Sequence, residues 1–173
     1  MEQQFQYYAF ISYKREDEKW AKWLQDRLRW YKLPSKLCRQ ITRLPKKVWP
    51  VFRDNTDLDS GRLEENIRHE LERSHYLIVI CSPEAARSPW VGKEVKYFAT
   101  LHGADKIIPF VVSGIPYSND IETECIHEQI KAISQEELLA INVREEGIGS
   151  FAMKKKRAFI RVVARLLDIK FYT

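Results

Sequence analysis

The sequence predicts an α/β fold in which a doubly wound parallel sheet is covered by helices on both faces. First, the most apolar runs are short and uninterrupted, as in Leu77-Ile78-Val79-Ile80, which is typical of strands buried on both faces. Second, stretches with apolar residues at helical spacing alternate with these runs, which favours right-handed strand–helix–strand crossovers. Third, 173 residues suit one domain with a hydrophobic core. We therefore expect a single domain over residues 1–173, with its core over about 7–170.

Apolar runs predict the strands, and apolar residues at helical spacing predict the helices. The expected strands are Tyr7–Tyr13, Val48–Phe52, Tyr76–Cys81, Ile107–Val112 and, more weakly, Leu138–Val143. The expected helices are Trp20–Tyr31 with Asp17 as a candidate cap, Leu63–Ser74 after Gly61, one opening at Ser88-Pro89, and Phe159–Leu166. Two long connections break the alternation, Lys32–Lys47 and Ser113–Gln129, and we expect a short helix in the second.

The composition is that of an ordinary globular protein, with 45% hydrophobic and 31% charged residues. The net charge of +5 is compatible with anionic small molecules or acidic partner surfaces. Nucleic acid is not expected as a partner, because Lys and Arg are spread along the chain. The one dense basic run, Lys154-Lys155-Lys156-Arg157, is more simply the solvated first turn of the last helix.

The cysteines and the N-terminus indicate a reducing compartment. Cys38, Cys81 and Cys125 are odd in number and have no CxxC spacing, which predicts neither a disulfide framework nor a zinc site. Cys81 ends an apolar strand and is expected to be a small core residue. The N-terminus has no signal-peptide pattern, and no apolar run approaches membrane-spanning length. We therefore expect a cytoplasmic protein with no membrane segment.

One acidic residue, Glu94, lies on the apolar half of an expected helix. At about 100° per residue, that half of the helical wheel is otherwise filled by Trp90, Val91, Val95, Phe98, Ala99 and Leu101. A carboxylate that faces a core costs several kcal/mol unless a partner compensates it. Glu94 is therefore a candidate functional residue. The alternative is a structural ion pair with Lys14 or Arg15.

Polar residues follow the predicted strands at the edge where ligands bind in such sheets. They are Ser12-Tyr13-Lys14-Arg15 after the first strand, residues 53–61 after the second, and two helix starts at Ser82-Pro83 and Ser88-Pro89. Helix starts present free backbone N–H groups, which suit a phosphate. The alternative is that these are well-capped, solvated loops. The sequence contains no GxGxxG, GxxxxGK[ST], GxSxG or HExxH motif, and its four histidines are scattered.

Four motifs in register resemble those of a TIR (Toll/interleukin-1 receptor) domain. They are Phe10-Ile11-Ser12-Tyr13, Phe52-Arg53-Asp54 with Leu58 and Gly61, Leu77–Pro83, and Ser88-x-Trp90-Val91-x-Lys93-Glu94. The resemblance covers nearly the whole chain. The segment from Trp23 to Pro34 and the long connection after it are similar to those of the bacterial branch.

The resemblance implies a flavodoxin-like three-layer sandwich with a five-stranded parallel sheet in the order 2-1-3-4-5. It also implies an enzyme of the NAD+ glycohydrolase or ADP-ribosyl cyclase type, in which Glu94 matches the catalytic acid. Such an enzyme cleaves the nicotinamide–ribose bond and releases nicotinamide with ADP-ribose or a cyclic or conjugated ADP-ribose. NAD+ is then the substrate, and neither a further cofactor nor a metal is expected.

The resemblance also assigns residues around Glu94. Tyr13, Lys14 and Arg15 match positions that line the pocket near the phosphates and adenine. Ser88 and Trp90 match positions that border the nicotinamide ribose. The remaining expected substrate-binding residues are Asp54 and Leu63, although some relatives have an aromatic residue in place of Leu63 and a larger residue in place of Gly92. A loop that gates the pocket and makes TIR–TIR contacts is matched by Asp54, Asn55, Thr56, Asp57, Leu58, Asp59, Ser60 and Gly61.

In bacteria such domains serve mostly in anti-phage defence, which is the biological role that the resemblance implies. The expected partners are NAD+, further TIR domains, and a separate effector or a fused sensor domain. The alternative is a non-catalytic signalling module that works through TIR–TIR contacts alone.

Overall fold

Five parallel strands form one sheet in the computed structural model, in the order β2-β1-β3-β4-β5. They are β1 (Tyr7–Ser12), β2 (Val51–Arg53), β3 (Ser74–Cys81), β4 (Ile107–Val111) and β5 (Ile141–Asn142). The structure describes residues 5–54, 61–134, 138–145 and 147–169, without the side chains of residues 61–64. The expected parallel sheet and its strand order 2-1-3-4-5 are confirmed.

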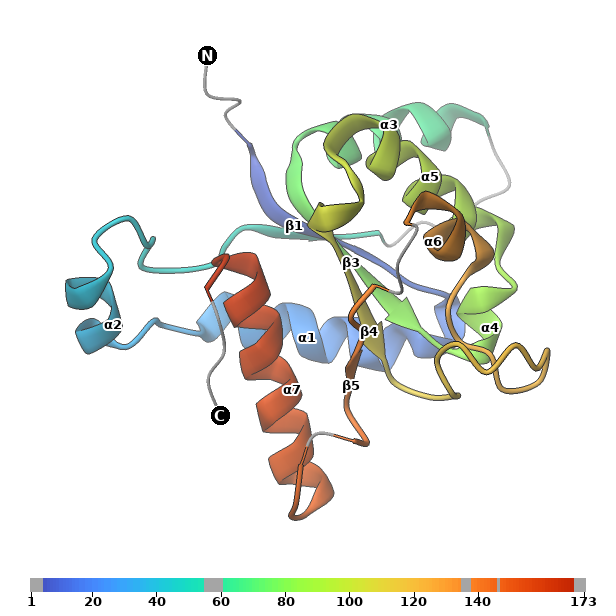
Figure 1. Cartoon of the computed structure of the whole chain (residues 1–173). Coiled ribbons are helices and arrows are strands. Elements are labelled where there is room, and N and C mark those ends of the chain that lie inside the picture. Colours follow the sequence, from blue (N-terminus) through green and yellow to red (C-terminus); the bar gives the residue numbers. More distant parts are fainter. Residues whose placement is uncertain (1–4, 55–60, 135–137, 146, 170–173) are drawn as a thin grey trace.

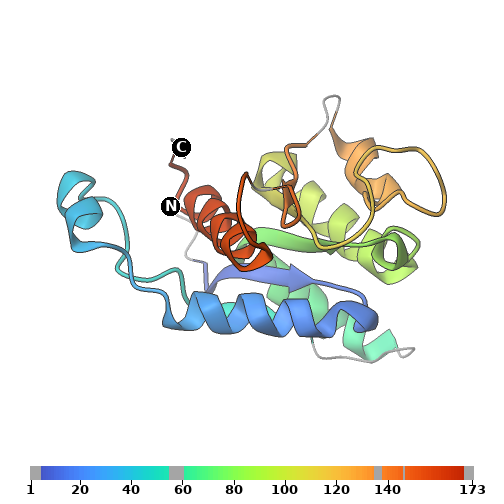
Figure 2. The same ribbon diagram turned by 90° about the horizontal axis from the view of Figure 1, so that it is seen from below.

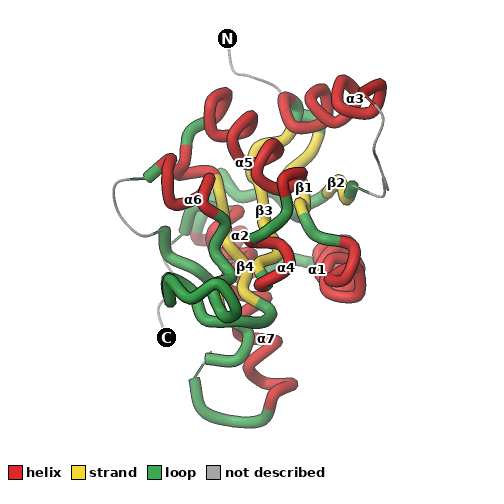
Figure 3. Tube along the Cα trace, turned by 90° about the vertical axis from the view of Figure 1, so that its right-hand side faces the viewer, coloured by secondary structure: helices red, strands yellow, loops and turns green. Residues whose placement is uncertain are grey.

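Helices cover both faces of the sheet (Figure 1 and Figure 2). One face packs against α1 (Glu18–Trp30) and α7 (Phe151–Leu166), and the other against α3 (Gly61–Glu72), α5 (Pro89–His102) and α6 (Glu128–Ile133). Figure 3 shows the strands between the α3–α5 side of the molecule and α7. Side chains alternate along a strand, so Ile78 and Ile80 of β3 face α1 and α7. Leu77 and Val79 face α5.

The central strands carry the core. Phe10 of β1, Leu77 of β3 and Phe110 of β4 are fully buried. Fully burying one such side chain contributes about 1.5–3 kcal/mol. Cys81 at the end of β3 is buried, as expected for a small core residue. Burial on both faces is the physical reason why the runs in β3 and β4 are apolar without interruption.

The two Ser-Pro pairs begin helices, as predicted. The hydroxyl of Ser82 accepts a hydrogen bond from the amide of Ala85 at the start of α4 (Pro83–Ala86). The hydroxyl of Ser88 accepts one from the amide of Val91 at the start of α5. Proline at the first helical position has no amide that would need a partner. The Ser88 cap therefore fixes the start of α5 and places Glu94 in its second turn.

Asp17 is the N-cap residue of α1, as expected, but by position only. Asp17 precedes α1 but its carboxylate makes no capping hydrogen bond. It ends a short 3-10 helix, η1 (Arg15–Asp17), and is buried where it accepts a hydrogen bond from the Ser82 hydroxyl. Burial raises the pKa of Asp17, and the Ser82 hydrogen bond lowers it. This contact joins the end of β3 to the start of α1.

Several boundaries differ from the expected ones. Strand β2 begins at Val51 rather than at Val48, because Pro50 has no amide to donate to a sheet ladder. Strand β5 has two residues, shorter than the expected Leu138–Val143. Helix α7 begins at Phe151, well before the first apolar residue used to predict it. The basic run from Lys154 was expected in its first turn, but the helix begins three residues earlier, where the side chains are exposed and show no apolar pattern of helical spacing.

The two long connections contain short helices. In the first, α2 (Ser35–Gln40) has no buried residue and lies away from the sheet (Figure 1 and Figure 2). In the second, the expected helix α6 begins only at Glu128. The turns before it are organised by the carboxylate of Glu124, which accepts hydrogen bonds from the amides of Tyr117, Asn119 and Ile126.

The basic run of α7 is only partly solvated. The ammonium of Lys155 lies over the rings of Trp20 and Trp23, 5.0 Å and 4.5 Å from their centroids. Burial lowers the pKa of Lys155. The interpretation of this run as a solvated turn therefore fails for Lys155, because cation–π contacts to α1 hold its ammonium. Among the described residues, no helix is long and apolar enough to cross a membrane.

Candidate functional site

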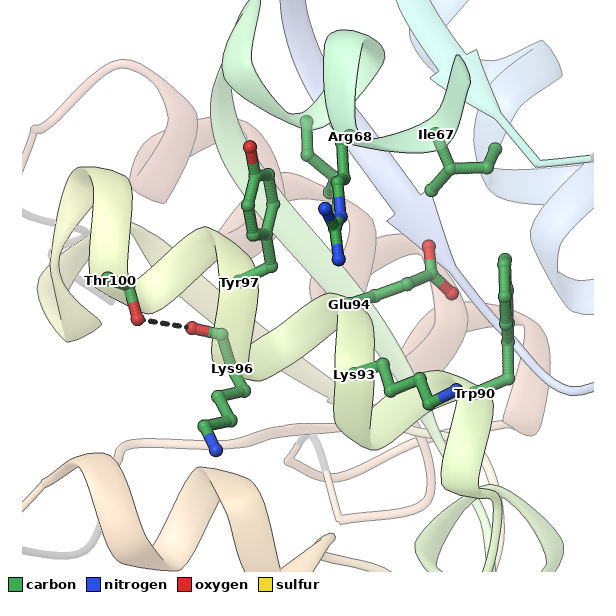
Figure 4. Close-up of a pocket in the computed structure, with 9 residues that line it drawn as sticks. Ile67, Arg68, Trp90, Lys93, Glu94, Lys96, Tyr97 and Thr100 are labelled. Carbon is green, nitrogen blue, oxygen red and sulfur yellow. Dashed lines mark hydrogen bonds between the residues drawn. The ribbon is translucent and has the colours of Figure 1, made fainter. Parts of the chain in front are cut away.

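Glu94 lies in a groove of about 410 Å³ between α3 and α5 (Figure 4). The groove is lined by Ile67, Arg68, Leu71, Trp90, Lys93, Glu94, Lys96, Tyr97 and Thr100. In Figure 4 the carboxylate of Glu94 points toward Ile67 of α3 and Trp90 of α5. The acid that the helical wheel identified is therefore at the wall of a cavity, not in the middle of the core.

The Glu94 carboxylate is almost dry. Only 3% of the residue is exposed. Its Oε1 accepts a hydrogen bond of 3.2 Å from the hydroxyl of Ser12, and its Oε2 is buried without a hydrogen-bond partner in the described structure. The expected alternative, an ion pair of Glu94 with Lys14 or Arg15, is therefore not the arrangement found. A lone buried carboxylate is costly, so the fold retains Glu94 at the expense of stability.

Three effects act on the protonation of Glu94. Burial raises the pKa of its carboxyl well above the usual range, and the negative charge of Asp54 raises it further. The hydrogen bond from Ser12 lowers this pKa, but by less. Perturbed pKa values of this kind, in a cleft and with specific partners, are typical of functional sites.

Asp54 is held beside Glu94 by Trp90. It follows β2, is 7% exposed, and its Oδ2 accepts a hydrogen bond of 3.1 Å from the indole Nε1 of Trp90. Trp90 lies one helical turn before Glu94 on α5. The bond thus links the end of β2 to the helix that carries Glu94. Asp54, Trp90 and Glu94 are the expected site residues that the structure brings together.

Ser12 was expected at the ligand-binding edge of the sheet, but no contact with Glu94 was predicted for it. Strand alternation contains the signal for it, because Phe10 and Ser12 are two residues apart and lie on the same face of β1. Phe10 packs in the core cluster of α3 and α5, so Ser12 faces the same side. What alternation cannot show is which residue of α5 lies opposite.

Tyr13 lies apart from Glu94. Its hydroxyl accepts a hydrogen bond of 3.0 Å from Arg53, whose Nε donates to Gln25 of α1 at 3.0 Å. Its ring packs with the core cluster of α1 and α7. Lys14 precedes η1, and Arg15 is its exposed first residue. The described contacts of Tyr13 thus place its side chain toward α1, on the face of the sheet opposite to Glu94.

The hydroxyl and the carbonyl of Ser88 are both hydrogen-bonded within the fold. Its hydroxyl caps α5, and its carbonyl is bonded by His127 Nε2 at 2.8 Å. The ring of His127 lies against Gly92, where a Cβ would come within 2.5 Å of His127 Cε1. The small residue at position 92, noted as a departure from some relatives, therefore has a local reason. The Leu63 side chain and residues Asn55 to Ser60 lie outside the described residues.

Tyr97 and the cationic side chains of the groove were also not predicted. The guanidinium of Arg68 lies 5.4 Å from the ring centroid of Tyr97. Lys93 and Lys96 line the same groove. All three cations are exposed on helix surfaces, where a sequence pattern does not distinguish a binding residue from a solvated one. Among the described residues, no group of three or more His, Cys, Asp or Glu is placed to hold a metal ion.

The arrangement combines a dry carboxylate, an aromatic wall and a cationic rim. A fixed carboxylate in a dry site stabilises positive charge that develops during a reaction. Exposed Arg and Lys attract anionic groups such as phosphates. The site thus suits a small molecule that carries an anionic group and that develops positive charge at a second position during a reaction.

Comparisons with known proteins identify the family and the fold. A family model described as TIR domain matches residues 9–137. The NAD(+) hydrolase ApTIR of Actinoplanes sp. is 36% identical over 110 residues, a match that covers 62% of this chain and 14% of that relative. The TIR domains of the activated Roq1 resistosome that recognises the effector XopQ superpose with a TM-score of 0.59 at 14% identity, covering 89% of this chain and 98% of that one. The chain belongs to the TIR domain family.

Proposed function

We propose that this chain cleaves NAD+ at the nicotinamide–ribose bond, with Glu94 as the catalytic residue. The observation that carries the proposal is the buried Glu94 carboxylate, whose Oε2 has no hydrogen-bond partner within the described structure, at the wall of a groove. The similarity to the NAD(+) hydrolase ApTIR supports the choice of substrate.

The chemistry needs one carboxylate in a dry site. When the nicotinamide–ribose bond breaks, its electron pair leaves with nicotinamide, and the ribose becomes an oxocarbenium-like cation. Nicotinamide carries a positive charge in NAD+, so it departs as a neutral base and needs no proton from a general acid. The ionised Glu94 would stabilise the ribose cation. The ring of Trp90 beside it offers an aromatic face to the cationic nicotinamide.

The cationic rim would receive the diphosphate. Arg68 of α3 and Lys93 and Lys96 of α5 line the groove that also contains Glu94. A dinucleotide places its two phosphates a few bonds from the reacting ribose. Its anionic and cationic parts therefore match the rim and the carboxylate of the same groove.

In the last step, water, a nucleophilic atom of the same ADP-ribose or a separate nucleophile would attack the ribose cation. The product is accordingly nicotinamide with ADP-ribose, a cyclic ADP-ribose or a conjugate. We further propose that the domain associates with other TIR domains and serves in anti-phage defence, with a separate effector or fused sensor as partner. Membership of the TIR family supports association, and the proposed depletion of NAD+ supports defence.

A turnover assay tests the proposal. Concentrated protein is incubated with NAD+, and nicotinamide is quantified beside Glu94→Ala, Glu94→Gln and the exposed control Glu122→Gln. We expect loss of at least about a hundredfold in kcat for both Glu94 variants and none for the control. Turnover that survives Glu94→Ala would contradict the assignment. Absence of turnover in the assembled wild-type protein, with self-association retained, would favour the non-catalytic signalling module.

A further inference from the structure

We propose that Ser12 is the positioning residue of Glu94: its hydroxyl holds Oε1 and thereby leaves Oε2 as the oxygen that faces the substrate. The effect of this role on catalysis depends on the proposed function. The contact itself is a property of the fold, and it can be measured without turnover.

The anchor of this contact is rigid. Ser12 is 0% exposed and is the last residue of β1, which lies between β2 and β3 in the sheet. Its Cα pairs with Val79 in the register of β3. Its short side chain has one rotatable bond before the hydroxyl oxygen, so the oxygen position follows from the backbone and one rotamer. Sheet geometry therefore determines where the donor is.

The acceptor, in contrast, is flexible by itself. A glutamate side chain has three rotatable bonds, and ordering such a side chain costs up to about 2 kcal/mol of conformational entropy. The 3.2 Å hydrogen bond from Ser12 to Oε1 fixes one end of the carboxylate. Since Oε2 is bonded to the same carbon, its direction is then set as well. Preorganisation of this kind reduces the reorganisation that a reaction requires.

A purely structural role for the pair is a poor explanation of its presence. Ser12 and Glu94 are both buried at the interface of β1 and α5. Replacing both members of a buried polar pair by apolar groups of similar shape is nearly neutral or stabilising. Stability alone therefore does not require a hydroxyl and a carboxyl at this place, whereas a substrate cation does.

Asp54, after β2, is the charged group that acts on Glu94 in the described structure. Arg68 of α3 and Lys93 of α5 are cations that line the same groove. The hydrogen bond from Ser12 lowers the pKa of Glu94 against burial and Asp54, which raise it. Removal of the hydroxyl is therefore expected to raise that pKa and move the acid limb of activity to higher pH.

The test compares Ser12→Ala with Ser74→Ala. Ser74 is an equally buried serine of β3, and its hydroxyl donates to the carbonyl of Glu70 at 2.7 Å. It pairs with Tyr7, at the opposite end of β1 from Ser12. For each folded protein the Glu94 carboxyl is titrated by NMR with 13C-labelled glutamate, and the pH profile of kcat is recorded with NAD+. Ser12→Cys keeps a weak donor and serves as the second variant if the alanine variant does not fold.

We expect Ser12→Ala to raise the Glu94 titration midpoint, shift the acid limb by the same amount and lower kcat about tenfold to a hundredfold. Ser74→Ala should change stability but neither pH profile nor midpoint. A Glu94 midpoint that Ser12→Ala leaves in place would overturn the inference whatever the turnover. If Ser12→Ala shifts the Glu94 midpoint but the wild-type protein does not turn over NAD+, the proposed function is overturned and the contact between Ser12 and Glu94 stands.

Discussion

At the scale of single residues, Glu94 combines an energetic cost with the chemical role proposed for it. Its carboxyl is buried, one oxygen is bonded by Ser12, and the other has no hydrogen-bond partner among the described residues. A buried carboxyl without a full set of partners lowers stability. The predictions at this scale concern the protonation and the cost of this one group.

Glu94→Gln is expected to stabilise the fold at neutral pH. The folded-state pKa of Glu94 is raised, whereas the unfolded chain titrates near 4.3. Below the unfolded pKa both states are protonated and ionisation costs nothing. As pH rises the unfolded chain ionises first, so wild-type stability falls until the folded carboxyl ionises too. We expect the variant to gain about 1–3 kcal/mol over wild type on going from pH 4 to pH 7.

Chemical denaturation of both proteins at the two pH values measures this gain. Glu122→Gln, an exposed matched change, should show no comparable pH-dependent gain. A stability difference between wild type and Glu94→Gln that is the same at pH 4 and pH 7 would show that folding does not raise the pKa of Glu94 above its value in the unfolded chain.

Asp54→Asn is expected to move the acid limb of kcat/KM to lower pH. The negative charge of Asp54 raises the pKa of Glu94, and asparagine removes that charge while its amide oxygen can still accept the Trp90 hydrogen bond. The pH profile measures the shift, and Asp26→Asn on exposed α1 surface is the control. An acid limb that stays in place after Asp54→Asn would show that the charge of Asp54 does not reach Glu94.

At the scale of elements, α5 is the part that organises the site. It carries Trp90 and Glu94 toward α3 and the sheet, while Gly92 turns toward α6. The ring of His127 fills the space beside Gly92, bonded through Nε2 to the carbonyl of Ser88 and through Nδ1 to the amide of Gln129. The position of α5 thus depends on the contacts of His127, in which Glu94 takes no part.

Gly92→Ala is expected to destabilise the protein by about 1–3 kcal/mol, although alanine favours a helix by about 1 kcal/mol over glycine. The added Cβ would lie 2.5 Å from His127 Cε1, so the clash outweighs the helical preference. In a His127→Ala background the space is free, and the same change should stabilise the protein. Thermal unfolding of the four proteins in this cycle measures both signs. Destabilisation by Gly92→Ala in both backgrounds would mean that His127 is not the obstacle.

At the scale of the whole molecule, part of the positive charge of the chain lies along the groove. The net charge is +5, and Arg68, Lys93 and Lys96 line the cavity that contains Glu94. Because these cations are exposed, salt screens them. We expect KM for NAD+ to rise with ionic strength while kcat changes little.

A charge-removal series measures this dependence. Arg68→Gln and Lys96→Gln should raise KM and flatten its dependence on salt, and Lys22→Gln on exposed α1 should do neither. If Arg68→Gln and Lys96→Gln show the same salt dependence of KM as wild type, the phosphates do not lie along this rim.

Some features of the site can be predicted from the sequence and others cannot. The apolar half of α5 around Glu94 follows from a period of about 100° per residue, which the sequence contains within a few positions. The hydrogen bond between Ser12 and Glu94 joins residues 82 apart in the chain. Tyr13, one position from Ser12, was expected in the pocket, yet its described contacts are with Arg53 and the α1 side.

The sequence by itself determined the α/β class, the positions of the main strands and helices, and the anomaly at Glu94. Each of these follows from local periodicity, capping and motifs that the chain carries in order. Only the tertiary structure decided that Ser12 and not Lys14 meets Glu94, that Asp54 is bound by Trp90, and that Arg68 of α3 shares the groove. Those contacts depend on strand register and on how α3 and α5 pack on the sheet. The proposed role of Glu94 rests on this packing, which leaves one carboxylate oxygen without a hydrogen bond in the described structure, beside a cavity.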